Sequence, residues 1–228
     1  MKKIILSAAA VFAFGFANAQ DATTTTTTGF GFAQGDIFVE GQLNFSSNNE
    51  TATFDGEDLN EEKQSSFNFS PKVGFFVSDK FAVGLQVNIG SGKSETTDFT
   101  TDPNVVVEES SSSFGAGAFA RYYFLNLGER FKTYTELGVG FGSTKNEVGS
   151  TETGKDTNLN IGIDLGINYF VTPNMAISFG LADILSFNSV KSEDASGDFE
   201  TTRSEFNGNI NSFNNFFNTP TFGLLYKF

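Results

Sequence analysis

The stretch Asn158 to Val171, NLNIGIDLGINYFV, decides how the rest of the chain is interpreted. Its odd-numbered positions are all apolar, whereas the even-numbered ones hold asparagine, glycine and aspartate, with Phe170 as the exception. Alternation with a period of two is typical of a β-strand, whose successive side chains point to opposite faces. At ~3.3 Å per residue and a tilt near 45°, the stretch rises roughly 33 Å, more than the apolar band of about 25 Å around a transmembrane barrel. It is therefore predicted to cross a membrane.

Similar alternation predicts seven further strands. They span residues 36–46, 65–77, 81–90, 114–124, 131–143, 175–187 and 216–228. The connections between the eight strands alternate long and short, which places both chain ends and all short turns on one side of the membrane. Closure into a ring would leave no unpaired edge in lipid. The predicted fold class is all-β, an eight-stranded antiparallel up-and-down transmembrane β-barrel over residues 36–228.

The bulk composition agrees with one such domain. The chain has 228 residues, 39% of them hydrophobic, and a mean hydropathy of -0.15, which is too polar for a bundle of membrane helices. It contains no cysteine and no histidine. Disulfides, Cys or His metal sites and imidazole catalysis are therefore excluded, and no cofactor is expected.

The N-terminus has the pattern of an export signal. Lys2 and Lys3 precede an apolar run over residues 4–16, and Ala17-Asn18-Ala19 forms a cleavage site. Residues 1–19 are predicted to be a signal peptide cleaved after Ala19, and residues 20–35 a flexible Thr/Gly-rich periplasmic lead-in. The remaining chain would carry 12 basic and 27 acidic residues, a net charge of -15. That charge argues against nucleic acid or an anionic membrane surface as a partner.

The last eight residues, TFGLLYKF, resemble the C-terminal assembly signal of bacterial outer-membrane barrels through Thr221, Gly223, Tyr226 and Phe228. Together with the alternating strands, they make the chain similar to small barrels of the OmpA/OmpX and opacity-protein type, particularly Phe-rich, Trp-free versions from Bacteroidota. The resemblance implies a bacterial outer-membrane location, contact with membrane lipid and lipopolysaccharide, and insertion by the outer-membrane assembly machinery. It does not imply one activity, because such barrels include adhesins, structural proteins, narrow channels and a few enzymes.

Charged residues occur on the polar, inward face of the predicted strands. The set comprises Glu40, Lys72, Arg121, Glu136 and Asp164. Arg121 is expected to lie diagonal to Glu136, and Glu40 to pair with Lys72 on the adjacent strand. An eight-stranded barrel holds little beyond its own side chains, so these charges favour a closed interior. A narrow ion pathway is the functional alternative.

Two further groups of residues are recognisable in the sequence. Inward aromatic residues are predicted to pack at the periplasmic end, namely Phe38, Phe76, Tyr123, Tyr134 and Phe170. The long outer loops are acidic, and Asp55, Glu57 and Asp58 in the first are a weak candidate site for a divalent cation, without the spacing of an EF-hand. Solvated negative surface is the favoured interpretation of these loops.

The sequence thus favours a monomeric structural or surface-interaction barrel. A small-solute channel is the first alternative, and a secreted lipocalin-like binding barrel with its apolar face turned inward is the second. An enzyme is not expected, because the acyltransferase, phospholipase and protease families of outer-membrane barrels rely on histidine.

Overall fold

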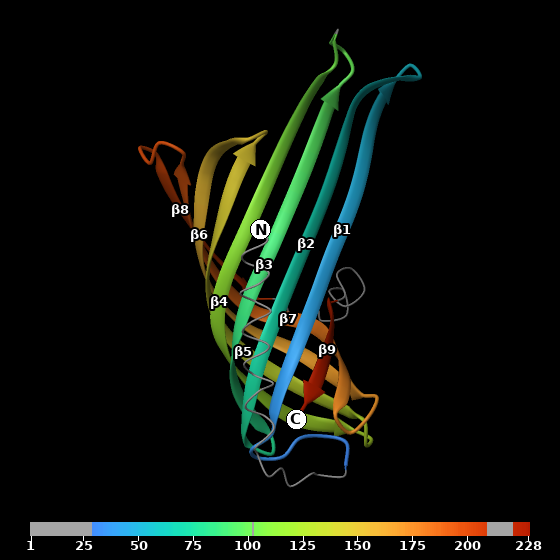
Figure 1. Cartoon of the computed structure of the whole chain (residues 1–228), viewed down its shortest axis with the longest axis vertical. Helices are drawn as coiled ribbons and strands as arrows, with labels where there is room; N and C mark the ends of the chain where they lie inside the picture. The colour runs from blue at the N-terminus through green and yellow to red at the C-terminus, as the bar shows by residue number, and fades with distance from the viewer. Residues whose placement is uncertain (1–28, 102, 209–220) are drawn as a thin grey trace.

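The computed structural model describes residues 29–101, 103–208 and 221–228. The predicted signal peptide and residues 20–28 lie outside this part. The described strands form one antiparallel sheet, in which β1 to β7 follow the chain order and β9 pairs with both β7 and β1 (Figure 1). The strands are β1 (Ile37–Phe54), β2 (Glu57–Ser78), β3 (Phe81–Asp98), β4 (Val105–Leu127), β5 (Phe131–Val148), β6 (Thr151–Phe170), β7 (Met175–Asp194), β8 (Glu200–Gly208) and β9 (Thr221–Lys227). The predicted ring of eight antiparallel strands is confirmed.

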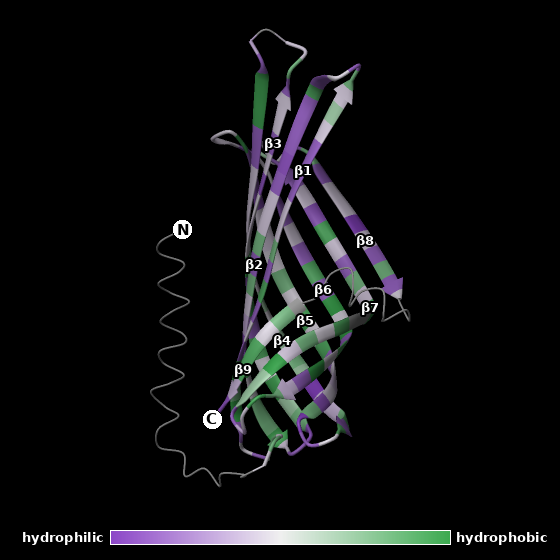
Figure 2. Cartoon of the chain, turned by 90° about the vertical axis from the view of Figure 1, so that its right-hand side faces the viewer, coloured by the Kyte–Doolittle hydropathy of each residue, from purple (hydrophilic) through white to green (hydrophobic). Residues whose placement is uncertain are grey.

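The first seven strands are longer than predicted. They contain 18 to 23 residues, because most of the expected long loops are extensions of paired strand. The first of these loops narrows to Asp55 and Gly56, whose φ angles of 53° and 88° are those of a tight hairpin turn. The prediction of long loops at residues 47–64, 91–112 and 144–156 was therefore wrong. Alternation is lost there because polar residues occupy both faces over most of these extensions, as the purple upper part of β2 shows (Figure 2).

The eighth position of the ring is shared by two strands. β9 pairs with the lower part of β7, from Met175 to Gly180, and with β1. β8 pairs with the upper part of β7, from Leu185 to Glu193, in a region that was predicted to be loop. The predicted start of the last strand at residue 216 lies outside the described residues.

The apolar faces of the strands point outward. Leu43, Phe45, Leu85, Phe141 and Leu224 are all exposed on the lower part of the barrel. Exposure of large side chains on every wall is unfavourable in water and expected in lipid. A lipocalin-like barrel needs the opposite arrangement. Among the described residues, no helix is long and apolar enough to cross a membrane.

β7 contains two register shifts relative to β6. They fall between Ile163 and Asp164 and between Leu165 and Gly166, so β7 carries extra residues at this level. As a result, the backbone of Asp183 pairs with that of Asp164. Bulges of this kind leave no signal in the hydropathy pattern of a sequence.

Candidate functional site: the closed periplasmic half of the barrel

A four-residue ion cluster fills the lower interior. Arg121 on β4 lies at its centre, with Nη1 2.6 Å from Glu40 Oε2 on β1 and Nε 2.6 Å from Glu136 Oε2 on β5. Lys72 on β2 donates to the other oxygen of Glu136. Arg121 and Glu40 are 0% exposed, Glu136 is 3% and Lys72 is 9% exposed. Two positive and two negative charges cancel, so the cluster as a whole is neutral and each ion has a partner.

The ion pairs in the structure differ from those predicted from the sequence. Arg121 lies directly opposite Glu136 rather than diagonal to it, because β4 continues to Leu127, which pairs with Phe131, and the register then shifts by one residue between Tyr123 and Leu125. Glu40 is opposite Lys72 in the backbone register, but the Glu40 carboxylate binds Arg121 and the Lys72 ammonium reaches Glu136. Asp164 neighbours Glu136 on β6 and is half-buried. Four of the five candidate residues thus converge in one cluster.

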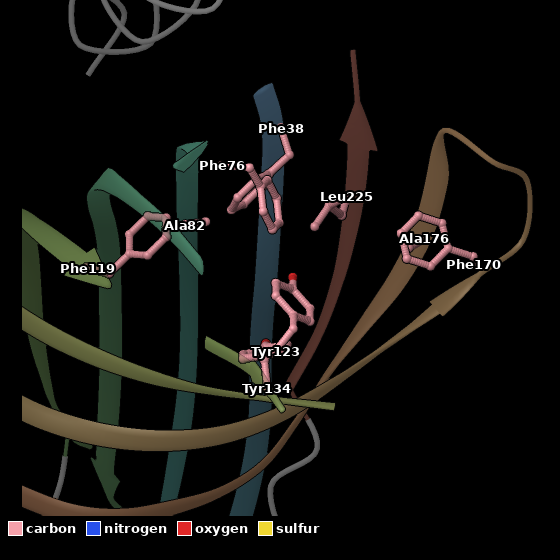
Figure 3. Close-up of a cluster of buried hydrophobic side chains, with 9 residues drawn as sticks. All are labelled: Phe38, Phe76, Ala82, Phe119, Tyr123, Tyr134, Phe170, Ala176 and Leu225. Carbon is pink, nitrogen blue, oxygen red and sulfur yellow. The ribbon is translucent and has the colours of Figure 1, made fainter. Parts of the chain in front are cut away.

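An aromatic layer closes the barrel beneath the ion cluster. All five predicted residues, Phe38, Phe76, Tyr123, Tyr134 and Phe170, belong to one buried core, which Ala82, Phe119, Ala176 and Leu225 complete. Figure 3 shows Phe38, Phe76, Leu225 and Tyr123 directed into the same space from β1, β2, β9 and β4. The predicted clustering of these five residues at one end of the barrel is confirmed.

Aromatic rings also surround the central guanidinium. The Tyr134 ring centroid lies 4.1 Å from Arg121 Cζ, and the centroids of Phe38 and Phe119 lie within 5.5 Å. Such contacts favour a cation over a ring face, most when both are desolvated. They add to the two carboxylates in holding Arg121 in one orientation.

Residues 29–35, assigned to the lead-in from the sequence, pack against the barrel floor. The Phe32 ring is stacked on Phe76 at 4.3 Å and lies 4.7 Å from Tyr123. Lys227 on β9 donates to the Gly31 carbonyl at 2.8 Å, and the Gln34 N–H donates to Asp79 at 2.8 Å. Residues 29–35 therefore form an ordered cover under the aromatic layer. Their sequence signal, two phenylalanines separated by one glycine, is too short to assign a location.

Comparison with protein families identifies the chain. The model of one family, described as a domain of unknown function (DUF2715), matches residues 41–224. The chain belongs to this family. No curated protein matches it.

Several solved outer-membrane barrels resemble this DUF2715 chain. Neisserial surface protein A is 16% identical, with 86% of this chain and 100% of that chain covered and a TM-score of 0.43. OprG from Pseudomonas aeruginosa is 12% identical, with 87% and 98% covered and a TM-score of 0.47. Ail, the attachment invasion locus protein of Yersinia pestis, is 13% identical, with 86% and 99% covered and a TM-score of 0.38. The closed antiparallel sheet of the DUF2715 chain and its apolar outer belt are the architecture of a membrane barrel. The resemblance to Bacteroidota versions stays a prediction.

Glycines opposite the aromatic side chains make room for them inside the DUF2715 barrel. A Cβ added to Gly166 would lie 2.3 Å from the Tyr134 ring, whereas one added to Gly138 would meet nothing within 4 Å. Gly138 therefore lies next to open space.

We expect Gly166→Ala to lower the free energy of unfolding by about 1–3 kcal/mol, because the buried Tyr134 must move. Gly138→Ala is the matched control, also on the inward face, and should change it by less than about 0.5 kcal/mol. Urea unfolding of both variants refolded in detergent measures the difference. Equal losses would contradict this account of Gly166.

The weak cation candidate lies at the tip of the first hairpin. Asp55 forms the turn, and Glu57 and Asp58 begin β2. Among the described residues, no group of three or more acidic, histidine or cysteine side chains is arranged to hold a metal ion.

Carboxylates at the tips of other hairpins have hydrogen-bond partners close by in the sequence. The Thr100 hydroxyl and N–H lower the pKa of Asp98, and the Ser196 hydroxyl and Phe199 N–H lower that of Asp194.

The residues of the predicted assembly signal lie on β9, which closes the ring, and directly after it. A Cβ at Gly223 would come within 3.0 Å of the Gly41 carbonyl oxygen on β1, so a larger residue would push the closing strands apart. The Phe228 N–H donates to the Ile37 carbonyl at 2.8 Å, and the Tyr226 ring packs edge-on against Phe228 at 4.8 Å. Thr221 pairs with Gly180 of β7.

Proposed function

We propose that this protein is a monomeric structural barrel of the outer membrane that is closed on its periplasmic side and presents long polar hairpins outside the cell. The observation that carries the proposal is the neutral ion cluster of Glu40, Lys72, Arg121 and Glu136 above the aromatic layer. In this proposal, residues 1–19 direct export and are removed after Ala19. The assembly machinery then recognises the C-terminal signal ending in Phe228.

The ion cluster and the layers beneath it favour a closed barrel over a channel. An ion moving along the barrel axis would have to pass Arg121 and then Phe38 and Phe76, all of which are 0% exposed. Opening the cluster would separate buried opposite charges, which costs several kcal/mol for each uncompensated ion. Residues 29–35 add a further layer below.

The upper hairpins support the surface-interaction part of the proposal. On β1, the strand continues from Phe45 to Phe54, which corresponds to about 20 Å of height at roughly 2.3 Å per tilted residue. Apart from Ala52, this extension is polar on both faces up to its last residue, and it is paired with β2 throughout. A rigid hairpin of this length holds its side chains well clear of the lipid.

We expect no steady nanosiemens-scale openings when the full protein is inserted in planar bilayers. Phe32→Ala should also be silent, because the ion cluster still closes the interior. Insertion is checked in both cases by a heat-dependent shift in gel mobility. Steady openings of the unaltered protein would support the small-solute channel instead and overturn the closed barrel.

A further inference from the structure

The outer face of the barrel repeats one short pattern just above the apolar belt. Along five strands, the last apolar residue is followed two positions on by a hydroxyl residue and four positions on by a lysine. The five series are Phe67, Ser65 and Lys63 on β2; Ile89, Ser91 and Lys93 on β3; Phe141, Ser143 and Lys145 on β5; Leu159, Thr157 and Lys155 on β6; and Phe187, Ser189 and Lys191 on β7. The five lysines, here called the lysine band, lie about 9 Å above the belt at roughly 2.3 Å per residue.

Glutamates stand beyond four of these lysines, on the side away from the belt. Lys63 lies 2.7 Å from Glu61, Lys145 lies 2.8 Å from Glu147, and Lys191 lies 2.9 Å from Glu193, each glutamate two positions further from the lipid. Lys93 reaches Glu108 on β4 at 3.0 Å. The side chains of these four lysines remain 43% to 52% exposed. Exposed pairs of this kind contribute little, so a stronger anion can compete for the ammonium groups.

Two members of the lysine band share a groove. Lys63 and Lys93 lie diagonally across β2 and β3, since Ser65 is the direct partner of Lys93. A groove of about 340 Å³ at this level is lined by both lysines together with Ser47, Asn49 and Ser65, and by Glu95 on the same face. Two ammonium groups with hydroxyl and amide donors between them match the requirements of a phosphate group.

We propose that the lysine band binds the phosphate groups of phosphorylated glycolipids in the outer leaflet, with the Lys63–Lys93 groove as its principal site. The proposal rests on the outer-membrane placement proposed above. Lipid phosphates lie just outside the acyl chains, which is where the lysines follow the last apolar residues. The hydroxyl row below supplies neutral donors, and the glutamates above disfavour an anion at a greater height. The net charge of -15 outside the predicted signal conceals this site, because five of the 12 cations in that part of the chain are gathered in one band.

The test compares the full protein with Lys63→Gln/Lys93→Gln after refolding in a zwitterionic detergent. The probe is bisphosphorylated lipid A, and the readout is the amount retained by the protein on size-exclusion chromatography over a concentration series. We expect binding at least about tenfold weaker for the double variant. The control, Lys80→Gln/Arg203→Gln, removes the same charge from the periplasmic turn and from the exposed β8 strand and should bind as the unaltered protein does.

Two further binding measurements identify the chemical group that is bound. Lipid A without its phosphates should bind the unaltered protein as weakly as the intact lipid binds Lys63→Gln/Lys93→Gln. Inorganic phosphate at millimolar concentration should not displace the intact lipid. Equal retention of the two lipids, equal binding by the double variant and the unaltered protein, or displacement by free phosphate would each overturn the proposal. Insertion into neutral phosphatidylcholine vesicles, followed by gel mobility, tests the membrane placement separately. If the protein inserts but binds both lipids equally, the proposed role of the lysine band is refuted and the membrane placement is not.

Discussion

Replacing Arg121 with methionine is expected to lower the free energy of unfolding by about 3–5 kcal/mol. The substitution leaves Glu40 and Glu136 buried with Lys72 as the one cation of the ion cluster, and Glu40 loses the partner 2.6 Å away. An uncompensated buried carboxylate is destabilising because the interior cannot replace its hydration. Urea unfolding of the barrel refolded in detergent, followed by gel mobility and circular dichroism, measures the loss.

Two variants separate charge from packing at this site. Arg203→Met makes the same substitution on β8, where the side chain is 79% exposed, and should change stability by less than about 0.5 kcal/mol. Arg121→Met/Glu136→Gln leaves one cation and one anion, and Glu40 lies opposite Lys72 in the register. It should therefore recover part of the loss. A double variant no more stable than Arg121→Met would show that packing of the arginine side chain, rather than charge balance, dominates.

Replacing Leu165 with arginine is expected to cost about 2–4 kcal/mol and to impair assembly, because the charge would lie near the middle of the bilayer. Leu165 is on the outward register of β6, opposite Thr135 of β5. Folding yield in phosphatidylcholine liposomes, scored by gel mobility, measures the effect.

Two control variants on β6 separate the effect of depth in the membrane from the effect of the face that carries the charge. Thr157→Arg lies on the same outward face above the apolar belt, where a cation costs about 0–1 kcal/mol. Asn160→Arg places the charge on the inward face, where Asn160 already donates to Asn188 at 2.5 Å. Both should fold better than Leu165→Arg. Equal yields for all three would contradict the assignment of the apolar face to lipid.

Sequence reasoning succeeded wherever one face of a strand meets lipid. Around Asn158 to Val171, alternation predicted the strand and which of its faces points outward, because hydrocarbon outside and a packed interior inside impose opposite requirements on successive residues. The same logic placed Phe38, Phe76 and Phe170 at the floor. Above Phe45 both faces meet water, so this signal vanishes and paired strand was mistaken for loop.

The sequence predicted which residues form the ion cluster but not how they pair. Alternation along the strands placed these four charged residues on the inward face. Their distances in sequence from the short turns placed them at similar heights. Their partners could not be predicted in this way, because Glu40 and Arg121 are 81 residues apart and meet across the barrel interior. The pairing of Leu127 with Phe131 and the one-residue register shift near Tyr123 together changed a diagonal neighbour into a direct one.

The sequence by itself determined that the chain forms an eight-stranded membrane barrel, which faces of its strands point outward, and which end holds the aromatic residues. Those properties follow from period-two patterning, which each strand carries locally. Only the tertiary structure decided which ions pair, that residues 29–35 cover the floor, and that five lysines far apart in the chain share one band. Each of these depends on register and ring closure, which bring together residues from different strands.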